Sequence, residues 1–366
     1  MKVALVHEYL IKQGGSENVL EALLEIFPGA PVYTSFYSPA TMPEHWRGYD
    51  IRSSFLQRLP LGQVNYQQRL QYFLPWMPLA YESFDLSGYD LVISSAHAFA
   101  KGVLTGPDTL HVSYLHTPTR YLWDQTWEYQ RSIRSAPLIR NLVPLALSQL
   151  RMWDFQAAQR PDHLIANSHH IQRRIEKFYR RSSRLIYPPV DTDFFGPVAD
   201  PSLDYYLVAG RFVPYKRLDL AIKAFNRLGL PLKVVGEGPE LARLRSQAHA
   251  NITFYPHQPR HALRDLFAHC RALIFAGEED FGILPVEVQA CGRPVIAYRR
   301  GGAGETVLDG ETGILFDAQT VEALIEAVRT NESQHWSEEA ICAQAGRFSR
   351  RRFQSEIKDL LFSLPG

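Results

Sequence analysis

The stretch GEEDFGILPVEVQACGRPVIAYRRGG, residues 277–302, carries two glutamates, Glu279 and Glu287, with seven residues between them. The apolar run before it predicts a strand, and Ile283 opens a predicted helix with Pro285 in its first turn, where proline is tolerated. The N–H groups of a first helical turn bind phosphate, and carboxylates accept hydrogen bonds from hydroxyls. Acids beside a phosphate site therefore indicate a ligand with a charged centre and many hydroxyls, such as a nucleotide sugar.

Each glutamate also has a plainer interpretation when it is taken singly. Glu279 can be a favourable charge near the helix start, and Glu287 a residue of the helix surface. Three further features argue against this interpretation: the cations Arg211 and Lys216 at the mouth of an earlier strand, and the glycine pair at 301–302 beyond the next strand.

Outward from this stretch, short apolar runs alternate with segments of helical periodicity, such as 217–228, along the chain. Runs this apolar are typical of strands buried on both faces of a parallel sheet. A Pro- and Asp-rich stretch around 187–201 separates two sets of them. The expected strands are KVALV (2–6), DLVISSA (90–96), LHVSYL (110–115) and HLIANS (163–168) in the first half, and YYLVAGR, LKVVGEG, ITFYP, ALIFAG and PVIAY in the second.

Strand, helix, strand at this spacing predicts right-handed βαβ units, and two sets predict two Rossmann-like, doubly wound α/β domains facing each other. We expect an N-terminal domain over 1–190, a C-terminal domain over 191–345 and a terminal helix within 346–366. In open α/β sheets ligands bind at the carboxyl ends of the strands, so the site is expected there, in the cleft between the domains.

The overall composition excludes several classes of protein. The 366 residues are 46% apolar and 21% charged with a formal charge of +1, so no global field recruits nucleic acid. Cys270, Cys291 and Cys342 form no CxxC pair, which argues against a disulfide framework or a zinc cage and favours a reducing cytoplasm. The first apolar run is too short for a signal peptide, and no run approaches the roughly 20 residues of a membrane span, so we expect a soluble or peripheral protein.

Three further motifs lie at the carboxyl ends of expected strands. Gly14 and Gly15 precede a helix, where they either admit a ligand to its N–H groups or form a plain turn. His116 follows a strand and can donate to a sugar hydroxyl, although most of the 13 histidines are expected to be structural or solvated. Arg211 and Lys216 lie where a diphosphate needs cations, or else belong to a solvated loop.

The motifs GRFVPYKR, GEGPE, EEDFGILPVEVQACGRPVIA and GGAGETVLDGETGILF, in this order and spacing, resemble the C-terminal half of the retaining glycosyltransferases of family four. The Glu, seven residues, Glu pattern is that family's signature, and Glu279 and Glu287 match it. The resemblance implies the GT-B fold, in which an acceptor-side domain and a nucleotide-sugar-binding domain face each other across a cleft and the last helix crosses back to the first domain. The segment HTPTRYLWD, 116–124, is similar to the corresponding segment of members that transfer mannose from GDP-mannose.

The resemblance also implies a role for each candidate residue. Arg211 and Lys216 would bind the donor diphosphate and offset the charge of the leaving group. Glu287 would hold the ribose hydroxyls, Glu279 would contact the transferred sugar, and His116 would lie near that sugar. The expected catalytic set is His116, Glu279, Arg211 and Lys216, and the expected donor-binding set is Gly14, Gly15, Arg211, Lys216, Glu279, Phe281, Gly282, Ile283, Leu284 and Glu287.

The activity that the resemblance implies is retaining transfer of a hexose, without a metal or other cofactor. We expect mannose to move from GDP-mannose to a saccharide or lipid-linked acceptor in cell-surface polysaccharide or glycolipid synthesis. A front-side displacement, in which the leaving phosphate takes the proton of the acceptor hydroxyl, is preferred to the two-carboxylate mechanism of retaining glycosidases. The alternatives are a UDP-sugar-dependent glycosyltransferase, a nucleotide-sugar epimerase of the same fold and a sensor that binds without turnover.

Two N-terminal stretches, 51–81 and 131–153, are basic, aromatic and aliphatic and contain no acid. This mixture suits an interfacial helix at an anionic membrane, which would bring a cytoplasmic protein to the inner face of the plasma membrane. In the plainer alternative, the apolar residues belong to the core and the arginines surround it. Single-stranded nucleic acid is bound by similar mixtures, but the cleft residues already account for a nucleotide sugar, so no nucleic-acid partner is expected.

Overall fold

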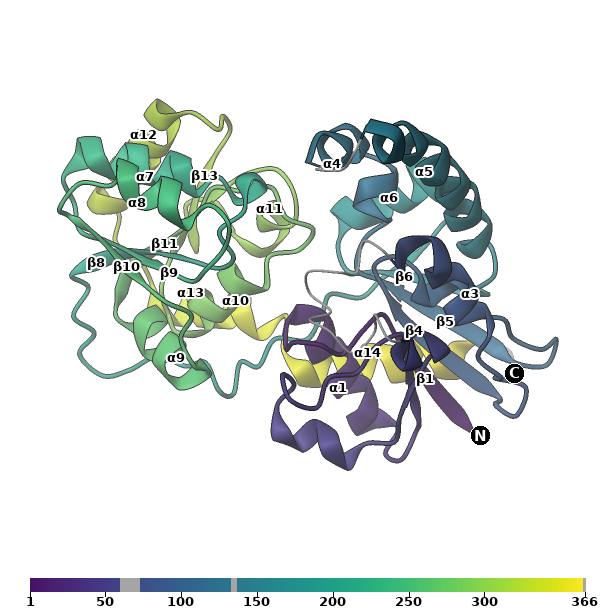
Figure 1. The fold of residues 1–366 in the computed structure, drawn as a ribbon. Helices are drawn as coiled ribbons and strands as arrows, with labels where there is room; N and C mark the ends of the chain where they lie inside the picture. The colour runs from purple at the N-terminus through teal and green to yellow at the C-terminus, as the bar shows by residue number, and fades with distance from the viewer. Residues whose placement is uncertain (60–72, 133–136, 365–366) are drawn as a thin grey trace. The chain divides into compact units, whose positions relative to one another are not determined.

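A computed structural model of the chain describes residues 1–59, 73–132 and 137–364 (Figure 1). The chain divides into two compact units. Unit 1 comprises Met1–Tyr187 and Gln354–Gly366, and unit 2 comprises Pro188–Phe353. The boundaries expected from the sequence lay at 190 and 345.

Unit 1 contains a parallel sheet with helices along it (Figure 1). Among the described residues, seven strands pair in the order β3-β2-β1-β4-β5-β6-β7, and each pairing is parallel. The order reverses between β1 and β4, the topological switch point at which open α/β sheets bind ligands. The elements are β1 (Val3–His7), α1 (Gly15–Ile26), β2 (Val32–Thr34), β3 (Ile51–Ser53), α3 (Met77–Glu82), β4 (Leu91–Ala96), β5 (Leu110–Leu115), α4 (Thr126–Ser132), α5 (Pro137–Ala157), β6 (His163–Ala166), α6 (His169–Tyr179), β7 (Arg184–Leu185) and α14 (Arg350–Ser363).

Unit 2 repeats this plan with six strands in the order β10-β9-β8-β11-β12-β13, again all parallel. Its switch point lies between β8 and β11. The elements are β8 (Tyr205–Ala209), α7 (Leu218–Leu228), β9 (Leu232–Val235), α8 (Leu241–Gln247), β10 (Ile252–Tyr255), α9 (Arg260–Ala268), β11 (Cys270–Phe275), α10 (Ile283–Ala290), β12 (Val295–Tyr298), α11 (Ala303–Thr306), β13 (Gly313–Phe316), α12 (Val321–Ser333) and α13 (Glu338–Gly346).

The expectation of two doubly wound α/β domains is confirmed. Every residue of the central strands β4 and β8 is buried, because helices cover both faces of a parallel sheet. Each unit has its own apolar core: Val6, Val92 and Leu164 belong to the first, and Val208, Val234 and Ile274 to the second. The polar side chains at the strand ends are therefore held by two separately packed frameworks.

Each strand expected from the sequence is present, and four further strands among the described residues were missed. β2, β3 and β7 are two or three residues long, below the length at which an apolar run is distinguishable from a loop. The fourth, β13, lies inside the glycine-rich segment that follows β12.

The last helix, α14, begins near the end of unit 2, and its residues from Gln354 onward belong to unit 1. The Gln354 side chain donates hydrogen bonds to the Ala22 carbonyl at 3.4 Å and to the Glu25 carboxylate at 2.6 Å, both on α1. Within the described parts of the chain, no helix combines the length and hydropathy needed to cross a bilayer.

Candidate active site

The switch point of unit 2 brings together Lys216 and Glu279, which come from different connections. Lys216 lies in the turn between β8 and α7, and Glu279 in the turn between β11 and α10. The Lys216 ammonium donates a hydrogen bond to Glu279 Oε1 at 2.6 Å, and the two side chains are only 16% and 22% exposed. A largely buried ion pair thus bridges the two strand ends, and both of its members belong to the expected catalytic set.

Glycines next to Lys216 and Glu279 leave space for this ion pair. A Cβ at Gly277 would lie 2.8 Å from Lys216 Cα, and a Cβ at Gly210 would lie 3.3 Å from Lys216 Nζ. Gly301, at φ +82°, passes so close to the turn that a Cβ would lie 2.4 Å from the Glu279 carbonyl oxygen. Because a side chain cannot occupy the spaces at Gly277 and Gly301, the backbone segments around the ion pair approach each other at these glycines.

The adjacent helix α10 begins at an open N-terminus. Its N-cap, Gly282, has φ +87°, a conformation that favours glycine, and contributes no side-chain hydrogen bond to the first turn. Ile283 and Leu284 are half-buried. Their N–H groups, like those at any helix start, lack intrahelical partners and suit an anion. Phe281 is buried, with its ring 5.5 Å from that of Phe348, so the turn before α10 is held by a buried aromatic contact.

Glu287 lies one turn into α10, in a partly exposed position. Burial raises the pKa of its carboxyl group to about 7; the charge of Asp191 acts in the same direction, and that of Arg260 opposes it. Arg260 donates instead to Asp191, at 2.8 Å, and no described residue forms a hydrogen bond with the Glu287 carboxylate. This acid is therefore available to hydroxyl donors from a ligand.

Arg211, the other predicted cation, directly follows Gly210 at the end of β8, and its side chain is exposed. Its guanidinium forms no ion pair with a described residue, whereas Lys216 is paired with Glu279. The structure thus gives the two predicted diphosphate ligands different starting states, one solvated and one neutralised by a partner.

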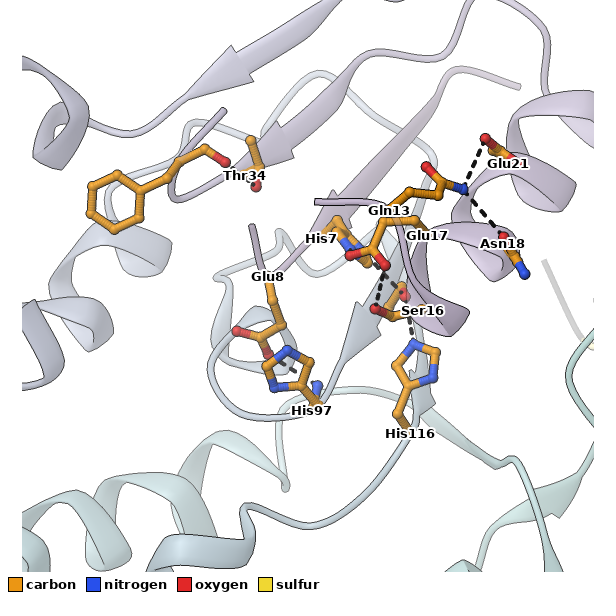
Figure 2. A network of polar contacts seen from close by, with 12 residues as sticks. His7, Glu8, Gln13, Ser16, Glu17, Asn18, Glu21, Thr34, His97 and His116 are labelled. Atoms are coloured by element: carbon orange, nitrogen blue, oxygen red, sulfur yellow. Dashed lines mark hydrogen bonds and ion pairs between the residues drawn. The ribbon is translucent and has the colours of Figure 1, made fainter. Parts of the chain in front are cut away.

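The switch point of unit 1 holds a linear network that the sequence predicted only in part (Figure 2). His7, the last residue of β1, lies beside Ser95 of β4 in the sheet register. Its Nδ1 is 3.1 Å from Ser95 Oγ, and its Nε2 is 3.3 Å from Glu17 Oε1 in the first turn of α1. The same Ser95 oxygen lies 2.8 Å from Nε2 of His116, so a continuous path joins Glu17 to His116.

The ionisation of this network is asymmetric. Burial acts to raise the pKa of Glu17, but the hydrogen bond with His7, together with hydrogen bonds from the N–H of Glu17 itself and from Ser16, leaves that pKa below its usual value. Burial lowers the pKa of His116 well below its usual value, and His97 and His7 act in the same direction. Glu17 is therefore an anion near neutral pH, and His116 a neutral imidazole.

Glu8, the next residue after β1, is also buried at this point. Its Oε1 accepts hydrogen bonds from the backbone N–H groups of His97, Ala98 and Ala100 at 3.1, 2.7 and 3.0 Å. The carboxylate thus shapes the loop that follows β4. Sequence reasoning missed His7, Glu8, Glu17 and Ser95, although His7 and Glu8 directly follow the first expected strand.

Gly14, predicted to bind the donor, is the N-cap of α1. A Cβ there would lie 3.0 Å from Glu17 Oε2, so the glycine leaves space for this carboxylate to turn toward His7. Gly15 is the first residue of the same helix. The donor-binding role of both glycines stays a prediction.

The two basic, apolar stretches lie partly outside the described residues. In the described portions, Phe73, Met77, Leu147 and Leu150 are buried in the core of unit 1. Other apolar residues of the same stretches are exposed: Phe55, Leu59, Trp76, Leu79, Leu145 and Met152. Some apolar residues of these stretches therefore belong to the core, as in the plainer alternative, and others lie on the surface, as the membrane-contact alternative requires.

Across the part of the chain that the structure describes, no group of three or more His, Cys, Asp or Glu side chains is arranged to hold a metal ion. The metal-independent mechanism stays a prediction.

Two family models match the chain, one for each half. Residues 13–194 match the model described as Glycosyltransferase Family 4, and residues 190–347 match that described as Glycosyl transferases group 1. Together the matches cover nearly the whole chain.

Curated relatives are similar over part of their length. A GDP-mannose-dependent alpha-(1-6)-phosphatidylinositol monomannoside mannosyltransferase of Mycolicibacterium smegmatis is 32% identical over 219 residues, which are 51% of this chain and 56% of the relative. A D-inositol 3-phosphate glycosyltransferase of Mycobacterium leprae is 30% identical over 284 residues, 66% of each chain. The chain thus spans between about half and two thirds of the length of these relatives.

Solved structures are similar over the full length. Anabaena Alr3699/HepE in complex with UDP and glucose has a TM-score of 0.73 at 19% identity and is covered completely, as is this chain. Sucrose-phosphate synthase from Thermosynechococcus elongatus has a TM-score of 0.71 at 18% identity, covering 98% of this chain and 99% of the other. This likeness shows the fold, and the expected GT-B class is confirmed.

Proposed function

The chain belongs to glycosyltransferase family four, and we propose that it transfers mannose from GDP-mannose, with retention, to a saccharide or lipid-linked acceptor. The observation that carries the proposal is the arrangement at the switch point of unit 2. The ion pair of Lys216 and Glu279, the open N-terminus of α10 and the unpartnered Glu287 all belong to one strand-end cluster. A diphosphate flanked by two polyhydroxyl groups matches these features in charge and in hydrogen bonding.

In this proposal the donor diphosphate binds to the N–H groups of Ile283 and Leu284, to Arg211 and to Lys216. Lys216 is held by Glu279 at 2.6 Å before the donor arrives, so its charge needs little reorganisation. Glu279 then accepts hydrogen bonds from hydroxyls of the transferred sugar.

The reaction follows as a front-side displacement. The bond between the anomeric carbon and the diphosphate oxygen breaks, and the bond to the acceptor oxygen forms on the same face. The proton of the acceptor hydroxyl passes to the departing phosphate, and the cations with the helix N–H groups stabilise the charge that develops there. His116 is assigned to a hydroxyl of the sugar.

The choice of GDP-mannose is supported by the name of the mycobacterial relative, which is GDP-mannose-dependent. A second candidate is a UDP-sugar-dependent transferase, favoured by the likeness to a structure in complex with UDP and glucose. A nucleotide-sugar epimerase of the same fold is the third, and it would convert the donor without any acceptor.

Calorimetric titration with GDP-mannose, GDP-glucose, UDP-glucose and UDP-N-acetylglucosamine, each with magnesium and with a chelator, separates these candidates. We expect selective binding of GDP-mannose that survives chelation. Selective binding of a UDP-sugar would replace the donor. A sugar product formed without acceptor would indicate the epimerase, and absence of binding by every donor would overturn the proposal.

The acceptor is proposed to lie at a membrane surface, on the cytoplasmic side. Leu145 and Met152 are exposed seven residues apart on α5, hence on one face of that helix, and Trp76 and Leu79 are exposed at the start of α3. Apolar residues with nearby arginines insert into anionic interfaces. The double variant Leu145→Ser/Met152→Ser should float less with phosphatidylglycerol vesicles, whereas Phe362→Ser, an exposed position on α14, should not change flotation. Equal flotation of both variants would remove this surface from the proposal.

A further inference from the structure

We infer that Glu17, His7 and Ser95 are positioning residues that fix the tautomer of His116, so that His116 presents an unprotonated Nδ1 to a substrate hydroxyl. The tautomer itself follows from contacts within unit 1. The identity of the hydroxyl, from a sugar, rests on the proposed function.

The polarity of the path begins at Glu17. An ionised carboxylate has no proton to donate, so the 3.3 Å contact between Glu17 Oε1 and His7 Nε2 requires the hydrogen on His7 Nε2. Ser16 Oγ donates to the other carboxylate oxygen at 3.0 Å, which also favours the charged form. The side chains of His7 and Glu17 are 1% and 6% exposed, so water does not compete at this contact.

The inference takes His7 to carry a single ring hydrogen, and the next two contacts then have one arrangement. With that hydrogen on Nε2, His7 has a lone pair on Nδ1, so the Ser95 hydroxyl donates to it across 3.1 Å. A serine hydroxyl has a single hydrogen, and once that hydrogen points to His7, the Ser95 oxygen can only accept. His116 must therefore donate from Nε2 across 2.8 Å, which leaves its Nδ1 unprotonated.

His116 is also held in place by its backbone and by its ring. Its N–H donates to the Ala96 carbonyl and its carbonyl accepts from the Asn167 amide, both at 2.9 Å. Its ring lies edge-on to Tyr114, with centroids 5.2 Å apart. Among the described residues, none forms a hydrogen bond with Nδ1, and the side chain is partly exposed. The lone pair of Nδ1 is thus the part of the ring left for a ligand, and a hydroxyl would donate to it.

The charge on Glu17 distinguishes this arrangement from the one in which every donor and acceptor along the path is exchanged. If Glu17 were replaced by an amide, the amide nitrogen could donate to His7 Nε2, and each hydrogen bond along the path would reverse. His116 would then carry its hydrogen on Nδ1 and would offer a donor where the substrate hydroxyl needs an acceptor. Glu17→Gln keeps the size of the side chain and removes only the preference.

The test is two-bond ¹H–¹⁵N correlation of protein labelled with ¹⁵N-histidine, which distinguishes a protonated from an unprotonated ring nitrogen. The signals of His116 and His7 are assigned with His116→Gln and His7→Gln. We expect hydrogen on Nε2 of both rings in the unmodified protein and loss of that preference at His116 in Glu17→Gln. Glu21→Gln, on the same helix but bonded to His45, is the matched control and should leave the His116 signals unchanged.

Activity gives a second readout. With a working donor and acceptor, Glu17→Gln and Ser95→Ala should lower kcat by about tenfold or more with little change in the KM of the donor, because a correctly protonated group is lost while the binding contacts of unit 2 remain. Ser95→Ala breaks the path with a smaller change in packing, so it tests the inference if Glu17→Gln fails to fold.

Hydrogen on Nδ1 of His116, a doubly protonated His7, or an unchanged His116 tautomer in both variants would overturn the inference. These spectra need no sugar transfer. If the tautomers behave as expected and no donor binds, the proposed function alone fails; if transfer is found and the tautomer does not depend on Glu17, this inference alone fails.

Discussion

Donor binding should depend on the ionisation of Glu287. Burial raises the pKa of this carboxyl to about 7, so that it is half protonated in the free protein near neutral pH. The ribose hydroxyls assigned to it are hydrogen-bond donors, and hydrogen bonds to a carboxylate favour its charged form. Binding should therefore release a proton wherever the free carboxyl carries one.

The magnitude follows from that pKa. If only the ionised carboxylate binds, the affinity is reduced by a factor of one plus the ratio of protonated to ionised carboxyl. With a pKa of about 7, this factor is about eleven at pH 6, about two at pH 7 and close to one at pH 8. We expect the affinity for the donor to rise about tenfold from pH 6 to pH 8, which corresponds to about 1.4 kcal/mol.

The assay is calorimetry with an intact nucleotide sugar, whose diphosphate diester has no group that titrates in this range. Titrations in two buffers of different ionisation enthalpy count the released protons, about half a proton at pH 7. Glu287→Gln should bind more weakly and lose the pH dependence, while Glu326→Gln, an exposed position on α12, should retain it. A pH dependence that persists in Glu287→Gln, or a flat profile in the unmodified protein, would refute the ribose assignment.

The same carboxyl should affect stability in the absence of ligand. Its pKa is higher in the folded protein, about 7, than the ordinary value of 4.5, so the folded state binds more protons between these values. The free energy of unfolding should fall by up to about 3 kcal/mol as pH rises through this window. Above the window it should no longer change with the ionisation of this group. Urea unfolding of Glu287→Gln should not show this fall, and its stability relative to the unmodified protein should be greater at pH 8 than at pH 5.

Three other substitutions give separate tests. Lys216→Ala should lower kcat at saturating donor by about 10²-fold or more with an unchanged circular dichroism spectrum, and unchanged turnover would rule out a leaving-group role. Gly302→Ala places a Cβ within 2.2 Å of the neighbouring backbone and should lower both the melting temperature and the donor affinity, whereas Gly196→Ala, with no atom within 4 Å of the added Cβ, should lower neither. Asp154→Ala leaves the buried Lys101 ammonium without the carboxylate 2.6 Å away and should cost about 3–5 kcal/mol in urea unfolding; a loss below about 1 kcal/mol would contradict the burial of that pair.

The fold was predictable because its strands are long enough and apolar enough to be recognised individually. β4, β5 and β11 each contain six residues, most of them buried, and the sequence shows them as runs in which apolar residues predominate. β3 and β7 contain three and two residues, and the local sequence has no pattern that separates them from a loop. They are strands because the neighbouring strands supply hydrogen-bond partners, which is information from the tertiary structure.

The unit 2 residues were predictable from local sequence, but their pairing was not. Lys216 and Glu279 each follow a recognisable strand, and both can be placed at the edge of the sheet. That they bond to each other depends on β8 and β11 being neighbours, although β9 and β10 lie between them in sequence. The adjacency of non-consecutive strands follows from the winding of the sheet.

The missed network in unit 1 has a different cause. Its members are separated by up to 109 positions, from His7 to His116, and no local motif unites them. Ser95 in particular lies inside a buried strand, where a serine indicates only a small side chain. Its importance arises because the register of β1 and β4 places His7 beside it and because β5 ends next to it. The general rule that strand ends carry function would have selected His7 and His116, but only the pairing of the strands identifies Ser95 as the residue that links them. The strand-end rule therefore finds groups that can touch a ligand, whereas the residues that orient those groups must be read from the sheet register.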